Sequence, residues 1–354
     1  MKPTIFPTSY HAWRHSGCAV LMCIVAVATT AANAQLRSEI KPGQVWNDTE
    51  GKPINAHGGC VIFHEGLYYW YGTHKIKGLS EKTHADGGFR CYSSKDLVNW
   101  KNEGMMLSLD RPEDEDLTHE CNADRPKVIF NKKTRKFVMF FKLYLRGQGT
   151  KIAYTAVATS PDPTGPFTYR HKFLGGNSAN GTGDFAMFKD DDGSLYHLAV
   201  RKPNKEFVIG KMRDDYLLPE GDYKVAKGIT KHTEGPALLK HMGQYIMLAS
   251  GSTGWRPNAA RQFSADSITG PWTPAKNPVS GKNPHNQLGA KLTFGGQSNF
   301  ILKVEGKENA FIAMFDINKP DHPYESGYIW LPITLKGSKM SIPWRDSWSL
   351  DVFK

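Results

Sequence analysis

Apolar residues in this chain come in short runs that are paired across turns. Residues 61–72, VIFHEGLYYWYG, form an apolar strand, a glycine turn and an aromatic return strand. Four further segments have the same form and begin at residues 128, 186, 237 and 300. Runs of this length, bounded by turn residues, predict β-hairpins. The pattern therefore predicts five hairpins along the chain.

A second pair of strands is predicted after most of these hairpins. FRCYSSKDLVNW ends the first unit, AVATSPDPTGPF the second, FVIGKMRDDYL the third and ARQFSADSITGPW the fourth. A recurring unit of four strands predicts a β-propeller. Two stacked β-sandwich domains are the alternative, but the chain lacks the linker that such a boundary needs. We expect an all-β fold, with one five-bladed β-propeller over residues 35–354.

A polar residue precedes each predicted inner strand. In chain order these residues are His57, Asp124, Asp184, Glu234 and Gln297. The innermost strands of a propeller converge on its axis, so we expect the five side chains to ring one end of that axis. Each residue alone is typical of a solvated loop, but the set predicts a site. Carboxylates that lie close together push each other's pKa values apart, as acid and base roles require.

The first 34 residues have the pattern of a secretory signal. Lys2 and Arg14 supply positive charge, residues 19–28 are apolar, and Ala32-Asn33-Ala34 is a small-residue cleavage pattern. The apolar run is short for a membrane span, so an uncleaved anchor is the less favoured alternative. We expect cleavage near Ala34, a secreted or periplasmic protein, and no membrane insertion.

Charge and cysteine content restrict the classes of partner. The net charge of +11 falls to +9 without residues 1–34, which hold two basic residues and no acid. The basic residues are scattered among acids, which argues against nucleic acid and leaves an acidic polymer or surface open. Cys60, Cys91 and Cys121 permit at most one disulfide and a free thiol, and whether one forms stays open. No cysteine or histidine pair has zinc-site spacing.

Five segments of the chain resemble glycoside hydrolase family 43. They are INAHGGCVIFHEGLYYWYG, RPKVIFNKKTRKFVMF, GDFAMFKDDDGSLY, EGPALLKHMGQYIMLASGSTGWRPNAAR and GGQSNFIL. The branch that the chain resembles most contains exo-β-1,3-galactanases. The resemblance spans essentially the whole mature chain in blade order. It implies a five-bladed propeller of inverting glycosidases, in agreement with the repeat count.

The resemblance also implies catalytic roles. Glu234 matches the family's general acid, and Asp184 matches the carboxylate that orients this acid and raises its pKa. Most of the wider family has a base aspartate after the histidine of the first blade, whereas His57 is followed by two glycines. The galactanase-like branch also lacks this aspartate. It is thought to use a glutamine of the last blade instead, and Gln297 matches that glutamine. Gln297 would act through its imidic tautomer or hold the water while another group, for which Asp124 is a candidate, takes the proton.

Other matches concern the sugar and cofactors. The family's substrate contacts match His57, Tyr154, Asn204, Asn258 and Trp255, the last of which would stack on a sugar face. The chain has Asp124 and Thr73 where the branch usually has glutamates, and sites that bind hydroxyl groups discriminate strongly when a partner is lost. We expect no required cofactor, and a structural calcium, as in parts of the family, stays open.

Three functions compete on these grounds. The leading hypothesis is an exported exo-glycosidase that releases galactose from β-1,3-galactan in a plant-type polysaccharide or oligosaccharide. The second is the same machinery acting as an α-L-arabinofuranosidase or β-xylosidase. The third, motivated by the missing aspartate after His57, is a non-catalytic carbohydrate-binding propeller. We expect the protein to be a monomer.

Overall fold

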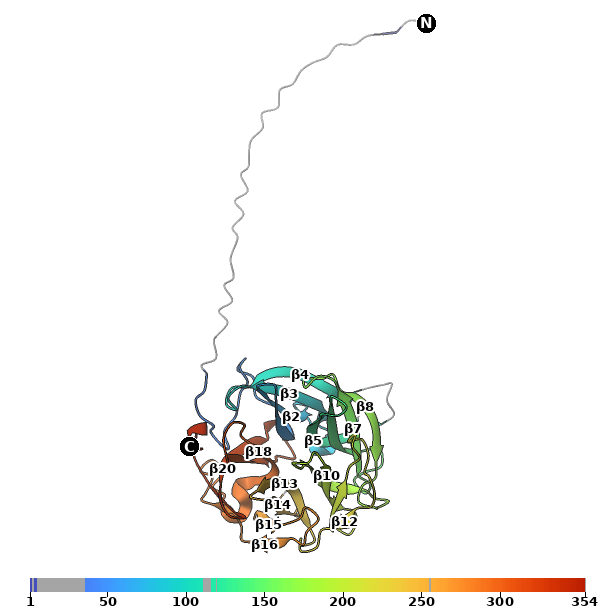
Figure 1. The fold of residues 1–354 in the computed structure, drawn as a ribbon. Coiled ribbons are helices and arrows are strands. Elements are labelled where there is room, and N and C mark those ends of the chain that lie inside the picture. Colours follow the sequence, from blue (N-terminus) through green and yellow to red (C-terminus); the bar gives the residue numbers. More distant parts are fainter. Residues whose placement is uncertain (2, 5–35, 111–115, 119, 255, 354) are drawn as a thin grey trace. The chain divides into compact units, whose positions relative to one another are not determined.

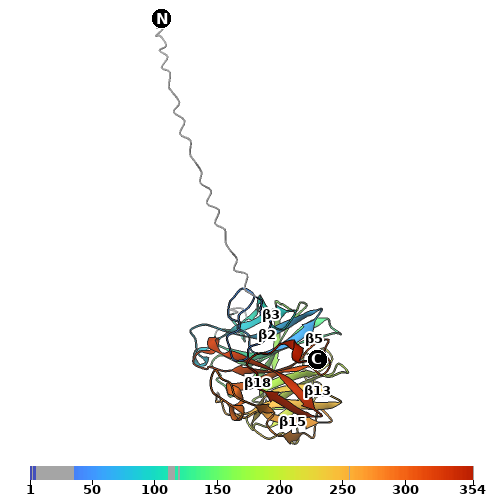
Figure 2. The same cartoon turned by 90° about the vertical axis from the view of Figure 1, so that its left-hand side faces the viewer.

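Five β-sheets are arranged in a ring around a central axis in the computed structural model (Figure 1). Figure 2 gives a perpendicular view of the same ring. The structure describes residues 1, 3–4, 36–110, 116–118, 120–254 and 256–353. The predicted signal segment, except for three residues, and Trp255 lie outside these residues. The predicted five-bladed β-propeller is confirmed.

The strands of the first three blades are as follows. The first blade has β1 (His57–His64), β2 (Leu67–Lys75), β3 (Asp86–Ser94) and β4 (Lys101–Ser108). The second has β5 (Asn122–Asn131), β6 (Lys136–Tyr144), β7 (Tyr154–Ser160) and β8 (Thr168–Phe173). The third has β9 (Thr182–Lys189), β10 (Leu195–Arg201), β11 (Phe207–Lys211) and β12 (Lys224–Val225).

The last two blades complete the ring. The fourth has β13 (Thr233–His241), β14 (Gln244–Gly251), β15 (Arg261–Ala265) and β16 (Thr273–Ala275). The fifth has β18 (Gly296–Lys303), β19 (Phe311–Ile317), β20 (Gly327–Lys336) and β21 (Lys339–Pro343), with β17 (Val279–Ser280) parallel to β21. Helices in the described part are short 3-10 turns: η1 (Glu81–Thr83), η2 (Ala290–Gly295), η3 (Pro323–Glu325) and η4 (Leu350–Val352). None of these helices is long and apolar enough to cross a membrane.

The core is divided into five apolar clusters, each between two neighbouring blades. Tyr69 and Tyr71 of β2 pack toward the second blade, whereas Tyr68 and Trp70 pack toward the fifth. This division follows from the alternation of side chains along a strand, because successive residues point to opposite faces of the sheet. Each blade is therefore apolar on both faces. Because both faces of an inner strand are buried, the inner hairpins are nearly continuous apolar runs.

The junction of the first and fifth blades closes the ring. Trp46, Trp70 and Trp330 pack together there, with ring centroids 4.8 to 6.1 Å apart. The segment before the first blade also pairs with the chain end, through a bridge between Ile40 and Trp348. Aromatic pairs in such contact add about 0.5–1.5 kcal/mol each beyond the area they bury. The closure holds the inner strands at fixed distances around the axis.

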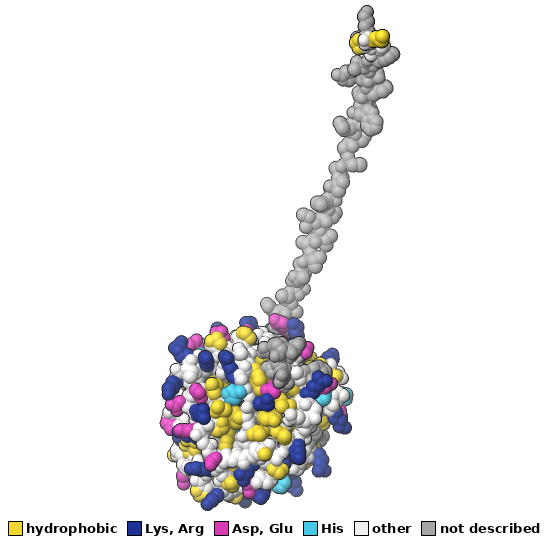
Figure 3. Space-filling view, turned by 90° about the vertical axis from the view of Figure 1, so that its right-hand side faces the viewer, with side chains coloured by type: hydrophobic (Ala, Val, Ile, Leu, Met, Phe, Trp, Pro, Cys, Tyr) yellow, Lys and Arg dark blue, Asp and Glu magenta, His cyan; other side chains and the backbone are white. Residues whose placement is uncertain are grey.

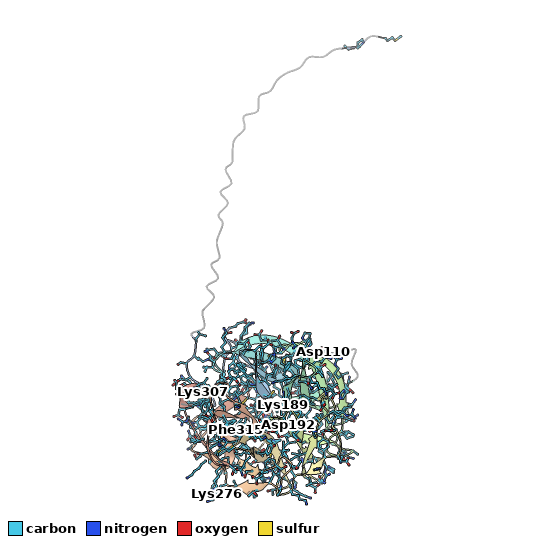
Figure 4. All side chains as sticks on the ribbon, in the orientation of Figure 1. Asp110, Lys189, Asp192, Lys276, Lys307 and Phe315 are labelled. Carbon is cyan, nitrogen blue, oxygen red and sulfur yellow. The ribbon has the colours of Figure 1, made fainter. Side chains whose placement is uncertain are left out.

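The surface carries charges of both signs, as the scattered basic and acidic residues of the sequence predict. On the face in Figure 3, basic side chains are interspersed with carboxylates. Phe315 lies inside the ring and Lys276 at its outer edge (Figure 4). Cys60 and Cys91 are buried free thiols.

Candidate functional site

The inner strands carry irregularities in their pairing at the point where they face the axis. The register shifts after His57 in β1, after Asp124 in β5 and after Glu234 in β13. The next residue in each of these strands has a positive φ: Gly58 at 64°, Arg125 at 56° and Gly235 at 60°. A β-bulge re-aims the side chain beside it. The bulges explain how three strands each direct a polar residue to the mouth of the axis.

These residues line a single cavity of about 280 Å³. All five polar residues predicted at the strand starts contribute to it: His57, Asp124, Asp184, Glu234 and Gln297. Its wall also contains four lysines, one arginine, and the carboxylates of Glu81 and Asp316. The structure thus brings together one predicted residue from each blade. The cavity is near the lower end of the range for small-molecule sites, about 300–1,000 Å³.

Glu234 is half-buried near the start of β13. Burial raises the pKa of its carboxyl group, and the negative charge of Asp184 raises it further. Oε1 of Glu234 lies 3.4 Å from Nε2 of Gln297, which donates to it. A carboxyl group that keeps its proton toward neutral pH can act as a general acid.

The pKa of Asp184 is shifted in the opposite direction to that of Glu234. Burial alone would raise its pKa, but the positive charges of Arg125 and Lys142 hold the pKa well below its ordinary value. Oδ1 of Asp184 lies 2.9 Å from Nε of Arg125 and 3.0 Å from Nζ of Lys142. Asp184 is therefore a fixed negative charge beside Glu234, and the environments of the two carboxyl groups separate their pKa values.

Arg125 and Lys142 were not identified from the sequence, yet they connect the site. Lys142 also lies 3.2 Å from Oδ1 of Asp124, and the guanidinium of Arg125 donates to the side-chain oxygen of Gln297. The result is a chain of alternating charges and dipoles that runs from Asp124 to Glu234. Arg125 makes these contacts from a left-handed backbone conformation, which costs a non-glycine residue about 1–3 kcal/mol. Such a conformation in the structure is a signal of function that the sequence does not carry.

The amide of Gln297 is bonded through both its oxygen and its nitrogen, and the oxygen can accept one further hydrogen bond. Its oxygen accepts from Arg125, and its nitrogen donates to Glu234 and, at 2.9 Å, to Oγ of Ser250. A hydrogen bond from a cation lowers the basicity of an amide oxygen still further. The side chain is therefore held rigidly between the acid and the arginine.

His57 presents a neutral imidazole to the cavity. Burial lowers its pKa to about 3, with smaller contributions from Lys75 and His74. Its ring stacks on Tyr328, at 5.2 Å between centroids, and neither ring nitrogen has a partner among the described residues. Buried polar atoms are normally paired, so these nitrogens indicate a place for a polar ligand. Thr73, its cross-strand partner, also lines the cavity with an unpartnered hydroxyl.

Comparison with known proteins identifies the family. The profile of the glycosyl hydrolases family 43 matches residues 49–326. The chain belongs to glycoside hydrolase family 43. A β-1,3-galactosidase of this family, solved with galactodeoxynojirimycin, is 36% identical with a TM-score of 0.80, over 88% of this chain and 100% of that chain. No curated protein matched the sequence.

Two exo-β-1,3-galactanases are also similar to this glycosidase. The enzyme from Phanerochaete chrysosporium, solved as a Glu-to-Ala variant with β-1,3-galactotriose, is 29% identical with a TM-score of 0.76, over 88% of this chain and 68% of that chain. The enzyme from Clostridium thermocellum is 29% identical with a TM-score of 0.75, over 88% of this chain and 66% of that chain. The resemblance to the galactanase-like branch of the family is thereby confirmed, and the chain is a glycosidase.

Three predicted substrate contacts of the glycosidase lie elsewhere than in the main cavity wall. Tyr154 is partly buried in the second blade, with Nζ of Lys172 5.4 Å from its ring centroid, and Tyr144 lines the cavity instead. Asn204 is exposed and bonds Glu206. Asn258 holds its own loop through Gly251 and lines a smaller hollow beside Gln297. Trp255, outside the described residues, follows Gly254 of the cavity wall.

The ammonium group of Lys127 is buried among oxygens of the first, second and fifth blades. Nζ of Lys127 donates to the carbonyl oxygens of Gly58 and Gly59, at 2.9 and 3.1 Å, and of Pro126, at 3.3 Å. It also contacts the Asn299 side-chain oxygen at 3.3 Å. Among the described residues, no group of three or more His, Cys, Asp or Glu side chains could hold a metal ion.

Proposed function

We propose that this protein is an exported, exo-acting, inverting glycosidase that releases galactose from β-1,3-galactan. The observation that supports it most is the environment of Glu234, whose raised pKa suits a general acid. Glu234 would protonate the glycosidic oxygen as the bond breaks. Asp184 would stay ionised and keep the acid protonated, since its pKa is held low by Arg125 and Lys142.

An inverting reaction needs a water molecule on the face of the sugar opposite the acid. The acid and base groups of such enzymes lie about 6.5–9.5 Å apart to admit this water. Gln297 lines the same cavity as Glu234 and would hold this water. Its imidic tautomer is disfavoured while its oxygen accepts from Arg125. Gln297 therefore positions the water, and a carboxylate of the cavity, such as Asp124, takes the proton.

The substrate class follows from similarity and from the size of the cavity. Relatives at 36% and 29% identity are described as a β-1,3-galactosidase and exo-β-1,3-galactanases. A cavity of about 280 Å³ at one end of the axis suits a terminal sugar better than an internal stretch of polymer. His57, which is buried and has unpartnered ring nitrogens, would bind sugar hydroxyl groups.

A second candidate is an α-L-arabinofuranosidase or β-xylosidase. It is favoured by Thr73 and Asp124, which replace the branch's usual glutamates and both line the cavity. Shorter side chains at two hydroxyl contacts would change which monosaccharide fits.

The deciding experiment compares substrates. The purified protein is incubated with β-1,3-galactobiose and with aryl α-L-arabinofuranoside and β-xyloside, and the products are separated by chromatography. Galactose release, with the α-anomer seen first by proton NMR, is expected. Glu234→Gln, purified in parallel, controls for contaminating glycosidases. Release of only arabinose or xylose would reject galactan as the substrate, and binding without any turnover would favour a carbohydrate-binding role.

Export, oligomeric state and cofactor need are parts of the same proposal. Amino-terminal sequencing of the secreted protein is expected to begin near residue 35, after cleavage of the pattern at Ala34. We also propose that the protein acts as a monomer and needs no cofactor. Lys127 supports the latter point, because its ammonium group occupies the carbonyl oxygens of Gly58 and Gly59 and the side-chain oxygen of Asn299.

A further inference from the structure

Two lysines of the cavity wall have no part in the proposed mechanism. Lys202 and Lys205 belong to the loop between β10 and β11, and both are partly exposed. The other three cations of the wall, Lys75, Arg125 and Lys142, each lie 2.7 to 3.0 Å from a carboxylate. No described carboxylate forms an ion pair with Lys202 or Lys205. These two lysines therefore give the wall a positive charge that the protein itself does not neutralise.

The ammonium group of Lys202 is held in place but keeps a free donor. It lies over the ring of Tyr144, 4.8 Å from the centroid, and 3.5 Å from the hydroxyl oxygen of the same residue. It also donates to the backbone oxygen of Thr150. An ammonium group has three N–H donors, so at least one is available to a ligand. Burial, together with the positive charges of Lys142 and Lys205, lowers the pKa of Lys202 to about 8. A bound anion would offset this repulsion.

Lys205 lies beside the strand that carries the candidate acid. Its backbone oxygen accepts from the N–H of His232, at 3.1 Å, two residues before Glu234. Burial and the charge of Asp184 raise the pKa of Glu234, and the positive charge of Lys205 is near enough to oppose them. Lys205 has a left-handed φ of 58°, and conformations of this kind cluster at sites that hold ligands. The loop thus places a free ammonium group on the acid's side of the cavity.

The loop's own carboxylate is committed to other partners. Glu206 forms ion pairs with Arg201 and, at 3.5 Å, with Lys231, and it accepts from Asn204 at 2.9 Å. It is therefore not available to neutralise the two lysines of the wall. Two nearby positive charges repel each other in the empty cavity and attract a ligand of negative charge.

We propose that Lys202 and Lys205 bind an anionic group, a carboxylate or a sulfate, on the sugar next to the galactose that is released. The inference rests on the proposed exo-galactosidase function. The acid Glu234 must contact the glycosidic oxygen, so the sugar on the far side of that oxygen lies on the acid's side of the cavity, where Lys205 is. The preferred substrate is then an acidic galactan. Such a polymer also suits the net charge of +9 that remains without residues 1–34.

The test uses three disaccharides that differ only at C6 of the reducing sugar. This carbon carries a hydroxyl group in β-1,3-galactobiose, is a carboxylate in the second substrate and carries a sulfate ester in the third. At low salt, kcat/KM of the unchanged protein should be about 10-fold higher on an acidic disaccharide than on galactobiose, the size of one charge-assisted hydrogen bond. Added salt should reduce this preference, because both ammonium groups are partly exposed. A preference for one acidic disaccharide alone would support the inference and identify the anion.

Substitutions of the two lysines are compared through the ratio of kcat/KM on the acidic disaccharide to kcat/KM on the neutral one. Lys202→Gln and Lys205→Gln keep a polar side chain without the charge, and each should lower this ratio. The double variant should bring it close to unity, whereas Lys205→Arg should retain the preference. An effect on the protonation of Glu234 cancels in the ratio, because both substrates need the same proton. Lys276→Gln removes a charge at the outer edge of the ring (Figure 4) and should leave the ratio unchanged.

Three results would overturn the inference. If galactobiose is cleaved but the ratio is near unity in the unchanged protein and in both variants, the two lysines do not select an anion, and the proposed function stands. An equal fall of the ratio in Lys276→Gln would attribute the preference to the net charge of the whole protein. Release of galactose from none of the three disaccharides would overturn the proposed function and this inference together.

Discussion

Arg125 and Asp184 form an ion pair between the second and third blades, with Nε of Arg125 2.9 Å from Oδ1 of Asp184. The pair joins a residue with a left-handed backbone conformation to the charge that controls the candidate acid. Because Asp184 stays ionised, its charge adds to burial in raising the pKa of Glu234. The protonation of Glu234 therefore depends on a residue from a neighbouring blade.

Replacement of Asp184 by Asn should shift the pH profile of the enzyme. Without the negative charge, and with Arg125 and Lys142 left uncompensated, the pKa of Glu234 should fall. A general acid works only while protonated, so the alkaline limb of kcat/KM should move to lower pH. Rates on the disaccharide across pH 4–9 would measure the shift. Asp214→Asn, which removes an exposed partner of Lys133, is the control, and an unmoved alkaline limb would contradict the role of Asp184.

Repetition in the sequence predicted the fold and the main positions of the site. His57, Asp124, Asp184, Glu234 and Gln297 each occupy one of the first three places of an inner strand, and all five line the cavity. Position within a repeat is a local property that hydrophobic periodicity reveals. The ring then brings equivalent positions together, whatever the distance between them in the chain.

Residues that reach the cavity by other routes could not be predicted in this way. Arg125 points inward because of a bulge and a left-handed φ, and Lys142 and Asp316 come from second strands. Tyr154 was selected by resemblance, while Tyr144 is the tyrosine in the cavity wall. Register and bulges decide such cases, because a shift of one residue moves a side chain to the other face.

Substitution of Glu234 by Gln should affect substrates unequally. The amide keeps the shape but cannot donate a catalytic proton, so hydrolysis of β-1,3-galactobiose should fall by about 10²–10⁴-fold. Activated aryl glycosides should lose much less, because their leaving groups need little protonation. Steady-state kinetics on both substrates would measure the difference, and equal losses on both would count against the acid role.

Gln297→Ala should impair both kinds of substrate. Water attack is required whichever group departs, and Gln297 is the cavity residue proposed to hold the water. The fold should survive, since Gln297 lines the cavity and is absent from the apolar clusters. Kinetics on both substrates, with circular dichroism as a check on folding, would measure the effect. Near-normal turnover would remove Gln297 from the mechanism.

Two glycines of the β13 hairpin region provide a matched pair for testing the bulge. Gly235 has φ +60°, and an added Cβ would lie 2.7 Å from the backbone oxygen of Ser298. Gly243 has φ +78° with no atom within 4 Å of an added Cβ. An alanine in the left-handed region costs roughly 1–2 kcal/mol. Gly243→Ala should therefore lose about that much stability and keep its activity.

Gly235→Ala should lose more stability than Gly243→Ala and also most of its activity. The clash with Ser298 must displace the strand beside Glu234, and with it the acid. Urea unfolding and kcat on the disaccharide would measure the two effects. If both variants kept full activity, the bulge would not be what positions Glu234.

The last prediction concerns Lys127, a lysine of β5 that is only 2% exposed. Lys127→Met would leave the carbonyls of Gly58 and Gly59 without their donor, and an unsatisfied buried polar group costs about 1–3 kcal/mol. Thermal and urea unfolding should therefore show a loss of stability of this size or larger. Lys303→Met, at an exposed position of β18, should change stability little.

The contribution of Lys127 to the free energy of unfolding should also depend on pH. Burial lowers the pKa of Lys127 to about 8, below the unfolded value of about 10.4. The unfolded chain therefore binds the proton more tightly, so this group's contribution to the free energy of unfolding rises between pH 8 and about 10. Lys127→Met should lack that rise.

The ammonium group of Lys127 already satisfies the oxygens around it. Dialysis against EDTA should therefore leave the melting temperature and activity of the unchanged protein as they were. A loss restored by calcium would mean that a metal ion binds elsewhere in the protein and stabilises it.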